Sequence, residues 1–320
     1  MDTSKSSIKG KAYEYACVLA LIELVAERCS VNIIDNTSLR IAKSRYENDI
    51  LPEEKANMLL SAKAGVVEII KMEPRIIAPD VSPISISIQP DSIATKSGDI
   101  RDVLIIRSQI GWEIGISVKH NHSALKHSRL SSHLDFGKVW LDTPCSSNYF
   151  QEISPIFDKL KSLHRNRLKW RSLADKEDSI YLPLLNAFRD ELERINSVNP
   201  KTTEKLVRYL VGSNGKDYYK LIHNQNHTIT VIPFNLYGTL NQSFDNVKPD
   251  KIIPSIELPT RIIDIAYKPN SKNTLILVMD NYWAISFRIH NASTVVEPSL
   301  KFDIQLAGQP AGLFYINQAW

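Results

Sequence analysis

The residues best suited to chemistry lie at the ends of two apolar runs, DVLIIR and ISVKHN. Asp102 opens the first run, Ser117 and Lys119 close the second, and a turn is expected around residues 108–111 between them. In a hairpin the start of one strand lies beside the end of the next, so these side chains should meet at one sheet edge. A carboxylate there can hold a divalent metal ion, and the lysine can position or deprotonate a water molecule. Together they suit phosphodiester hydrolysis.

A second acid is needed, because one carboxylate seldom holds Mg²⁺ well. Glu113 lies six strand residues before Lys119, which is roughly 20 Å at about 3.3 Å per residue, too far to share a metal ion unless the strand is broken. Glu14 is the better candidate, because it shares the apolar face of a predicted helix with Cys17 and Leu21. Such an acid is either buried at a cost or bound to something. The alternative is a partly exposed acid near the start of the helix.

The elements expected to position these residues form an α/β arrangement, a sheet flanked by helices. Periodicity and breaker residues predict helices at 11–29, after Asn36, at 51–74, at 123–141, at 150–163, at 181–195 and at 202–212. They predict strands at 82–90, two within 102–121, and several short ones from about 226 onward. We therefore expect a first domain over residues 1–215, with added helices, and a β-rich subdomain over residues 216–320.

Composition narrows the class of protein. Lys and Arg outnumber Asp and Glu by 39 to 35, and this excess of +4 is too small to imply nucleic acid by itself. The three cysteines show no zinc-binding spacing, which favours a reduced, intracellular protein. The longest apolar stretch, CVLALIELVA, is too short to span a bilayer. We expect a cytoplasmic protein with no membrane partner.

Several stretches resemble a known enzyme family. The chain resembles the HaeIII-type type II restriction endonucleases, within the PD-(D/E)XK nuclease superfamily. The matching stretches are KGKAYEYA, MEPRI, SGDIRDVLIIR, WEIGISVKHNHSALKHSRLSSHLDFGKVW, CSSNY and GTLNQ. The resemblance implies a PD-(D/E)XK-like nuclease core in residues 1–215. It implies a Mg²⁺-dependent enzyme that cuts both strands of duplex DNA at GGCC, and a companion cytosine methyltransferase that protects host DNA. The β-rich part would then clamp the DNA or mainly stabilise the fold, and a homodimer would suit the palindromic site.

Carried over residue by residue, Asp102 matches the first metal-binding acid of the nuclease core, and Lys119 matches its lysine. Ser117 departs from the pattern, because the broad core usually has Asp or Glu there. The second metal ligand is therefore expected from Glu14, with Asp99, Glu113 and Asp135 as the other candidates. The dipeptide Pro79-Asp80 lies far upstream of the lysine and is interpreted as a chance match.

The basic segment after Lys119 is the expected DNA-contacting part. On a helix beginning after Ser123, Lys126 and Arg129 would face the same side, although a solvated polar face is the alternative. The candidate contacts are His120, Asn121, His122, Lys126, His127 and Arg129. The string HNH also invites a ββα-metal nuclease or a zinc site, but adjacent residues on one strand end do not provide either frame.

Three other segments leave alternatives open. Residues 164–172 could follow a phosphate backbone or form a solvated helix, and Asn241 and Gln242 could read bases or shape a turn. At the level of function, a repair-type nuclease of low sequence specificity competes with the restriction enzyme. A non-catalytic DNA-binding protein on a decayed nuclease core is the third alternative, which Ser117 keeps open.

Overall fold

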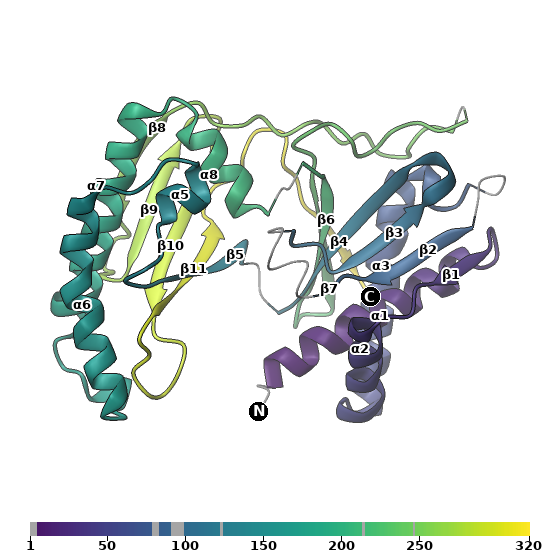
Figure 1. The fold of residues 1–320 in the computed structure, drawn as a ribbon. Helices are drawn as coiled ribbons and strands as arrows, with labels where there is room; N and C mark the ends of the chain where they lie inside the picture. Colours follow the sequence, from purple (N-terminus) through teal and green to yellow (C-terminus); the bar gives the residue numbers. More distant parts are fainter. Residues whose placement is uncertain (1–4, 79–82, 91–98, 122–123, 213–214, 246) are drawn as a thin grey trace. The chain divides into compact units, whose positions relative to one another are not determined.

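The chain forms two compact units in a computed structural model, which describes residues 5–78, 83–90, 99–121, 124–212, 215–245 and 247–320 (Figure 1). Unit 1 comprises residues 1–123, 213–256 and 312–320, and unit 2 comprises residues 124–212 and 257–311. Among the described residues, no helix is long and apolar enough to cross a membrane.

Unit 1 is built on a mixed seven-stranded sheet with the order β1-β2-β3-β4-β6-β7-β12. Its strands are β1 (Val31–Ile33), β2 (Ile84–Ile88), β3 (Val103–Arg107), β4 (Trp112–His120), β6 (Tyr218–His223), β7 (Thr228–Phe234) and β12 (Ile316–Ala319). The β1–β2 and β4–β6 pairs are parallel, and the other neighbours are antiparallel. β3 and β4 form the predicted hairpin around a short 3-10 turn, Ser108–Ile110.

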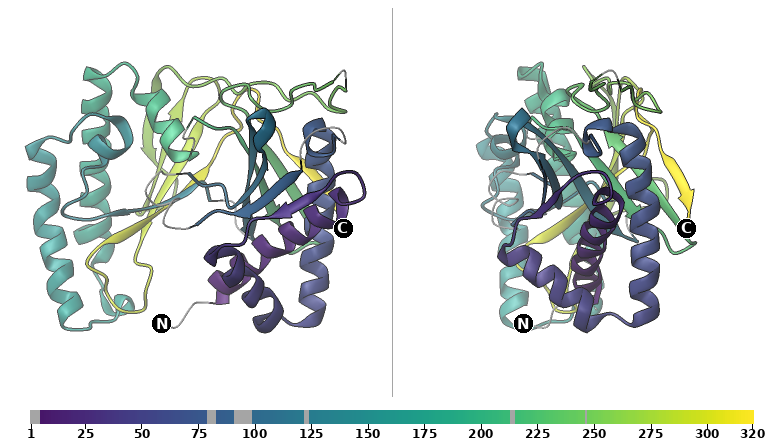
Figure 2. Two further views of the ribbon diagram at one scale, coloured as in Figure 1. Left: turned by 45° about the vertical axis from the view of Figure 1, so that its right-hand side comes forward. Right: turned by 90° about the vertical axis from the view of Figure 1, so that its right-hand side faces the viewer.

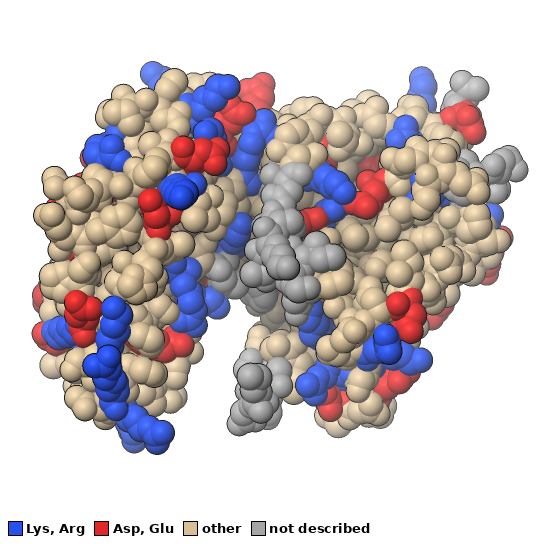
Figure 3. Space-filling model, viewed as in Figure 1, with Lys and Arg blue, Asp and Glu red and all other residues tan. Residues whose placement is uncertain are grey.

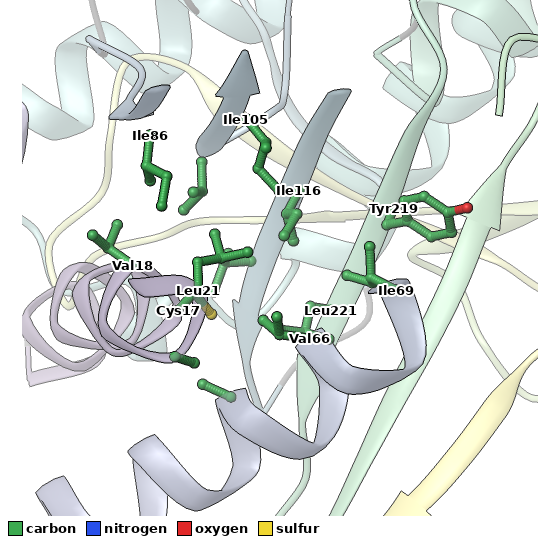
Figure 4. Packing of buried hydrophobic residues seen from close by; sticks show 14 of the residues in the cluster. Cys17, Val18, Leu21, Val66, Ile69, Ile86, Ile105, Ile116, Tyr219 and Leu221 are labelled. Carbon is green, nitrogen blue, oxygen red and sulfur yellow. The ribbon is translucent and has the colours of Figure 1, made fainter. Parts of the chain in front are cut away.

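Two helices of unit 1, α1 (Lys5–Val25) and α3 (Pro52–Met72), pack on this sheet, and α2 (Thr37–Asp49) packs on α1 (Figure 2). Figure 4 shows Val18 and Leu21 of α1 and Val66 of α3 directed toward the sheet, against residues such as Ile116. All four are fully buried. Gly65 allows the close approach of α3, because a Cβ atom there would lie 2.3 Å from a methyl group of Leu221. The core therefore fixes α1 against β4.

Local signals set the ends of these helices as the sequence predicts. The Asn36 side chain caps α2 by accepting a hydrogen bond from the backbone of Leu39 at 2.9 Å. Pro52 begins α3 with two acids in its first turn, and Pro74 follows its end. The three predicted helices and the three strands after them are confirmed, although the short strand β1 between α1 and α2 was not predicted. The α/β class with a mixed sheet flanked by helices is also confirmed.

Unit 2 combines helices with an antiparallel five-stranded sheet of order β5-β11-β10-β9-β8. Its strands are β5 (Lys126–Leu130), β8 (Ile262–Tyr267), β9 (Thr274–Met279), β10 (Ala284–His290) and β11 (Leu300–Leu306). Its helices are α5 (Phe136–Leu141), α6 (Ser147–Arg165), α7 (Leu182–Val198) and α8 (Thr202–Leu210), with a π-turn at Glu177–Tyr181. Phe188 of α7 contacts both Phe287 and Phe302 of the sheet, so an aromatic core joins the two layers.

The structure divides the chain differently from the expected boundary after residue 215. Residues 124–212 join the last β-rich segment in unit 2, whereas β6, β7 and β12 complete the sheet of unit 1. The cause is strand pairing over long sequence separations, such as β5 with β11 and β4 with β6. Periodicity, which is local, does not report such pairing.

The helix predicted from residue 123 is wrong in its first half. Residues Lys126–Leu130 form strand β5, paired antiparallel with β11, and the helix α5 begins only at Phe136. The apolar spacing there suits either element, and the hydrogen-bonding edge of β11 decides in favour of a strand.

Candidate active site

The β3–β4 hairpin places Asp102 beside the end of β4. Val103 pairs with Ile116, and the backbone N–H of Asp102 donates to the carbonyl oxygen of Ile116 at 2.9 Å. The next residue on β4 is Ser117, so Asp102 lies level with it at the hairpin's open end. This end of the sheet, carrying Asp102, Ser117 and Lys119, is called the catalytic edge below.

One carboxylate oxygen, Asp102 Oδ2, collects three donors at the catalytic edge. The backbone N–H of Val118 donates at 2.6 Å, Lys119 Nζ at 3.1 Å and Ser117 Oγ at 3.4 Å. The side chains of Asp102 and Lys119 remain 23% and 20% exposed, so solvent reaches both. The predicted meeting of these three side chains is confirmed, and the fixed backbone donor orients the carboxylate.

Helix α1 brings a second carboxyl group to the same region. Glu14 is buried, and Lys11, one turn earlier, pairs with it at 3.1 Å. Burial, and then the negative charge of Asp102, raises the pKa of Glu14 to about 8, against the opposing charges of Lys11 and Lys119. Glu14 and Asp102 are thus close enough for like-charge repulsion. A divalent cation near both carboxylates would relieve this repulsion, and the role of Glu14 as the second acid stays a prediction.

The competing acids Asp99 and Glu113 are held by Arg101 instead. Arg101 Nη2 donates to Asp99 Oδ2 at 2.6 Å, and Arg101 Nη1 donates to Glu113 Oε1 at 2.7 Å. Lys216 is a further partner of Glu113 at 2.7 Å. Glu113 pairs with Ile106 near the closed end of the hairpin, as the regular strand predicts. Asp99 and Glu113 therefore form ion pairs with Arg101 and Lys216.

Asp135, the remaining candidate acid, lies in unit 2 and caps α5. Its Oδ1 accepts hydrogen bonds from the backbone of Lys138 at 2.8 Å and of Cys145 at 3.0 Å. These contacts give it a structural role. The dipeptide at residues 79 and 80 lies outside the described residues.

The expected DNA-contacting segment is divided between the two units. In unit 1, His120 stacks on His223 with ring centroids 4.8 Å apart, and it also contacts the ring of Tyr13. Asn121 is exposed, in a left-handed conformation with φ of 59°. His122 lies outside the described residues. His120 is therefore a packed side chain at the catalytic edge, and Asn121 projects beside it.

The other half of the segment lies on β5 in unit 2, where residues three apart point to opposite faces. Lys126 lies 3.7 Å from the ring centre of Tyr209, and burial lowers its pKa to about 8. Arg129 is exposed and pairs with Glu297 at 3.2 Å. The shared helical face expected for Lys126 and Arg129 is therefore wrong. His127 lies on β5 between them.

Asn241 and Gln242, which could read bases or shape a turn, make hydrogen bonds within the protein. The side chain of Asn241 donates to the carbonyl oxygens of Met72 and Lys251 and accepts from Ile253, which is a turn-forming role. Gln242 likewise donates to the carbonyl of Gly238. Among the described residues, no group of three or more His, Cys, Asp and Glu side chains is arranged so that it could hold a metal ion.

Two lysines near the catalytic edge were not predicted. Lys11 lies three residues before Glu14 on α1, and this spacing on a helix was visible in the sequence. Lys220 lies on β6, paired with Ser117 of β4. Nothing in the sequence indicated this neighbour, because the two residues are joined only through a distant parallel strand pairing.

Comparison with known proteins identifies the chain's relatives. The family described as HaeIII restriction endonuclease matches residues 10–310, which include both the catalytic edge and Glu14. The chain belongs to this family. The chain is 44% identical to the type II restriction enzyme HaeIII of Haemophilus aegyptius over 320 residues, and the alignment covers 99% of each chain. No solved structure matches the chain.

Membership of the HaeIII family makes the protein a type II restriction endonuclease, a site-specific deoxyribonuclease. Enzymes of this type generally use a divalent metal ion, and the two carboxylates of Asp102 and Glu14 fit such an ion. Mg²⁺ is usually held by one or two protein carboxylates, with water and substrate phosphate completing its octahedron.

Glu113→Gln is expected to leave the cleavage rate of this HaeIII family member within about threefold of wild type, because Glu113 pairs with Arg101 and Lys216 rather than with Asp102. Single-turnover cleavage of a duplex with one recognition site measures this. Loss of cleavage with DNA binding intact would move the second acid from Glu14 to Glu113.

Proposed function

We propose that this restriction endonuclease makes Mg²⁺-dependent double-strand cuts in DNA at GGCC. In this account Asp102 and Glu14 hold the metal ion, and Lys119 assists the attacking water. The observation that carries the proposal is the convergence of Lys119 and Ser117 on Asp102 at the catalytic edge, with Glu14 electrostatically coupled to the same carboxylate.

Each residue has a part that follows from its contacts. The backbone N–H of Val118 and the hydroxyl of Ser117 both donate to Oδ2 of Asp102, and these two hydrogen bonds fix the orientation of the carboxylate. Lys119 holds a water molecule in line with the scissile phosphorus and stabilises the negative charge that develops there. When bound, a divalent ion polarises the phosphate and lowers the pKa of water. The oxygen–phosphorus bond from water then forms while the bond to the leaving oxygen breaks.

The small net charge of the chain does not by itself indicate where DNA would bind. Basic and acidic side chains are interspersed on the face shown in Figure 3. The whole formal excess of +4 nevertheless falls on unit 2, since unit 1 is balanced. We propose that the segment after Lys119 contacts DNA and that basic residues of unit 2 contribute to backbone binding. The candidates for direct contact stay as predicted: His120, Asn121, His122, Lys126, His127 and Arg129.

Specificity for GGCC is supported by the similarity to the HaeIII enzyme over nearly the whole chain. A cytosine methyltransferase of the same specificity would then protect the host, as a genetic rather than physical partner. The site reads the same on both strands, which suits either a homodimer with two-fold symmetry or one chain that cuts the strands in turn.

Digestion of a plasmid of known sequence in Mg²⁺ tests this function, with the fragment ends mapped by sequencing. We expect discrete fragments that end within GGCC, and protection when the cytosines of that sequence are methylated beforehand. A smear would favour the repair-type nuclease. Binding without any cut would favour the decayed nuclease core that Ser117 suggests.

A further inference from the structure

Residues 165–171 of unit 2, called the basic segment below, belong neither to the catalytic edge nor to the DNA contacts predicted above. The segment carries an exposed cation at every second position: Arg165, Arg167, Lys169 and Arg171. It is not the solvated helix that the sequence left open, because α6 ends at Arg165 and the chain then turns through a left-handed Arg167, with φ of 51°. Trp170 packs against the ring of Tyr181, with ring centroids 5.8 Å apart.

The loop that joins β10 and β11 holds the basic segment in place. The backbone N–H of Trp170 donates to the carbonyl oxygen of Thr294, and that of Val296 donates to the carbonyl oxygen of Leu168, both at 2.9 Å. His164, just before the segment, donates through Nδ1 to the carbonyl oxygen of Val296 at 2.7 Å. Figure 1 shows this loop beside the end of α6. The four cations therefore project from backbone that is already ordered.

The same loop also contacts Arg129, one of the predicted DNA contacts on β5. Arg129 pairs with Glu297 at 3.2 Å and donates to Ser299 Oγ at 3.0 Å. Lys169 pairs with Val295 in an isolated antiparallel bridge. Only two positions separate residues 295 and 297, so at most about 7 Å of extended chain lies between the two contact points. Arg129 and the basic segment therefore lie at one end of unit 2, although they are far apart in the sequence.

The positive charge of the basic segment is not offset by neighbouring acids. Among the residues that the structure describes, no Asp or Glu lies at ion-pair distance from its four cations. The acids nearest along the chain have other partners, since Asp158 pairs with Lys161 at 3.1 Å and Asp175 pairs with Lys159 at 3.4 Å. Figure 3 shows Lys and Arg side chains gathered over the lower end of α6, where the segment begins. Like charges in one short segment repel one another, and a polyanion bound along them would remove that repulsion.

We propose that the basic segment and Arg129 form one surface that binds the phosphate backbone of a DNA duplex. Guanidinium and ammonium groups bind phosphate oxygens whatever the base sequence, so this surface supplies affinity rather than recognition of GGCC. Because the backbone is already ordered, binding costs only the ordering of the side chains. The inference rests on the proposed function, since it takes the duplex that the enzyme cuts as the ligand.

The double variant Arg165→Gln/Arg171→Gln, which removes the charges at the two ends of the segment, tests this surface. Binding of a duplex with one GGCC, and of a duplex without it, is measured over a range of KCl concentrations with Ca²⁺ in place of Mg²⁺. Each phosphate contact contributes about 0.9 to the slope of log K against log salt concentration, so we expect the slope to fall by about 0.9–1.8. This slope change corresponds to about 8- to 60-fold weaker binding at 0.1 M salt, for both duplexes alike.

Two further variants control for the loss of side-chain bulk and for any loss of surface charge. Arg165→Lys/Arg171→Lys keeps both charges and should retain most of the affinity, because a lysine still neutralises a phosphate as a point charge. Lys161→Gln is the matched control, since Lys161 lies on α6 and is paired with Asp158, and its slope should equal that of wild type.

An unchanged slope and affinity in the glutamine double variant would overturn the inference. Weakening confined to the GGCC duplex would also overturn it, because that result indicates base reading rather than phosphate binding. Cutting of the GGCC duplex by wild type in Mg²⁺ is measured in parallel. A wild-type protein that binds DNA without cutting it would contradict only the proposed cleavage, and the slopes would still decide the inference.

Discussion

Asp102→Asn is expected to lower the single-turnover cleavage rate by about 10²- to 10⁴-fold, because metal-assisted stabilisation is worth several kcal/mol and each 1.36 kcal/mol is a tenfold change in rate. The amide keeps the size of the side chain and can still accept from Val118, but it removes the charge that would hold the ion. Specific binding of the duplex should survive, since Asp102 is not among the proposed DNA contacts. Rapid-quench assays on a duplex with one site, alongside equilibrium binding, measure both quantities.

Lys119→Met is the companion variant, and we expect a loss of similar size, because the ammonium that contacts Asp102 is removed while the apolar stem remains. Asp49→Asn serves as the control, since Asp49 is a surface acid that pairs with Arg45 on α2. Near-normal cutting by either Asp102→Asn or Lys119→Met would show that the chemistry lies elsewhere in the chain.

Glu14→Gln is expected to abolish metal-supported cutting and, at the same time, to stabilise the metal-free fold at high pH. The pKa of Glu14 is raised from 4.5 to about 8 in the folded protein. Between these values the folded state binds more protons than the unfolded state, so stability falls as pH rises through this window. The glutamine of the variant does not ionise, so the variant does not lose this stability as pH rises. Its free energy of unfolding should exceed that of wild type by up to about 5 kcal/mol at pH 8.5, and the difference should fall below about 0.5 kcal/mol near pH 4.5.

Urea denaturation of both proteins at pH 4.5 and pH 8.5, without divalent metal, measures the stability difference. Mn²⁺ binding, followed by calorimetry, provides a readout that does not depend on cutting, and we expect it to weaken in the variant. Glu23→Gln is the control on the same helix, because Glu23 is a half-exposed acid paired with Lys63. A Glu14→Gln protein that binds Mn²⁺ and cuts normally would remove Glu14 from the metal site.

The sequence alone predicted the catalytic edge because its geometry is local. Asp102, Ser117 and Lys119 belong to one hairpin, and alternation along β3 and β4 is enough to bring them together. The exclusion of Glu113 rested on strand length alone, and its ion pair with Arg101 agrees with it. Glu14 could be proposed because a charged residue on an apolar helical face is unusual, although only the fold shows which strand α1 covers.

The parts that could not be predicted depend on pairing between distant segments. The local sequence around Lys126 predicts a helix, but these residues form a strand because they pair with β11, nearly 180 residues later. Lys220 lies beside Ser117 only because β6 pairs with β4. The predicted domain boundary differs from the observed division for the same reason, because each unit is assembled from separate stretches of chain. Local pattern contains no information on which distant edge a strand will join.

A crystal structure of the protein with a GGCC duplex and Ca²⁺ in place of Mg²⁺ would show directly which carboxylates hold the metal ion. Ca²⁺ binds protein oxygens at about 2.3–2.6 Å, and its position reports the ligands without allowing the reaction to proceed. We expect an ion bound by the carboxylates of both Asp102 and Glu14, beside the scissile phosphate and within reach of Lys119. An ion held by Glu113 or Asp99, or a scissile phosphate away from Asp102, would contradict this expectation.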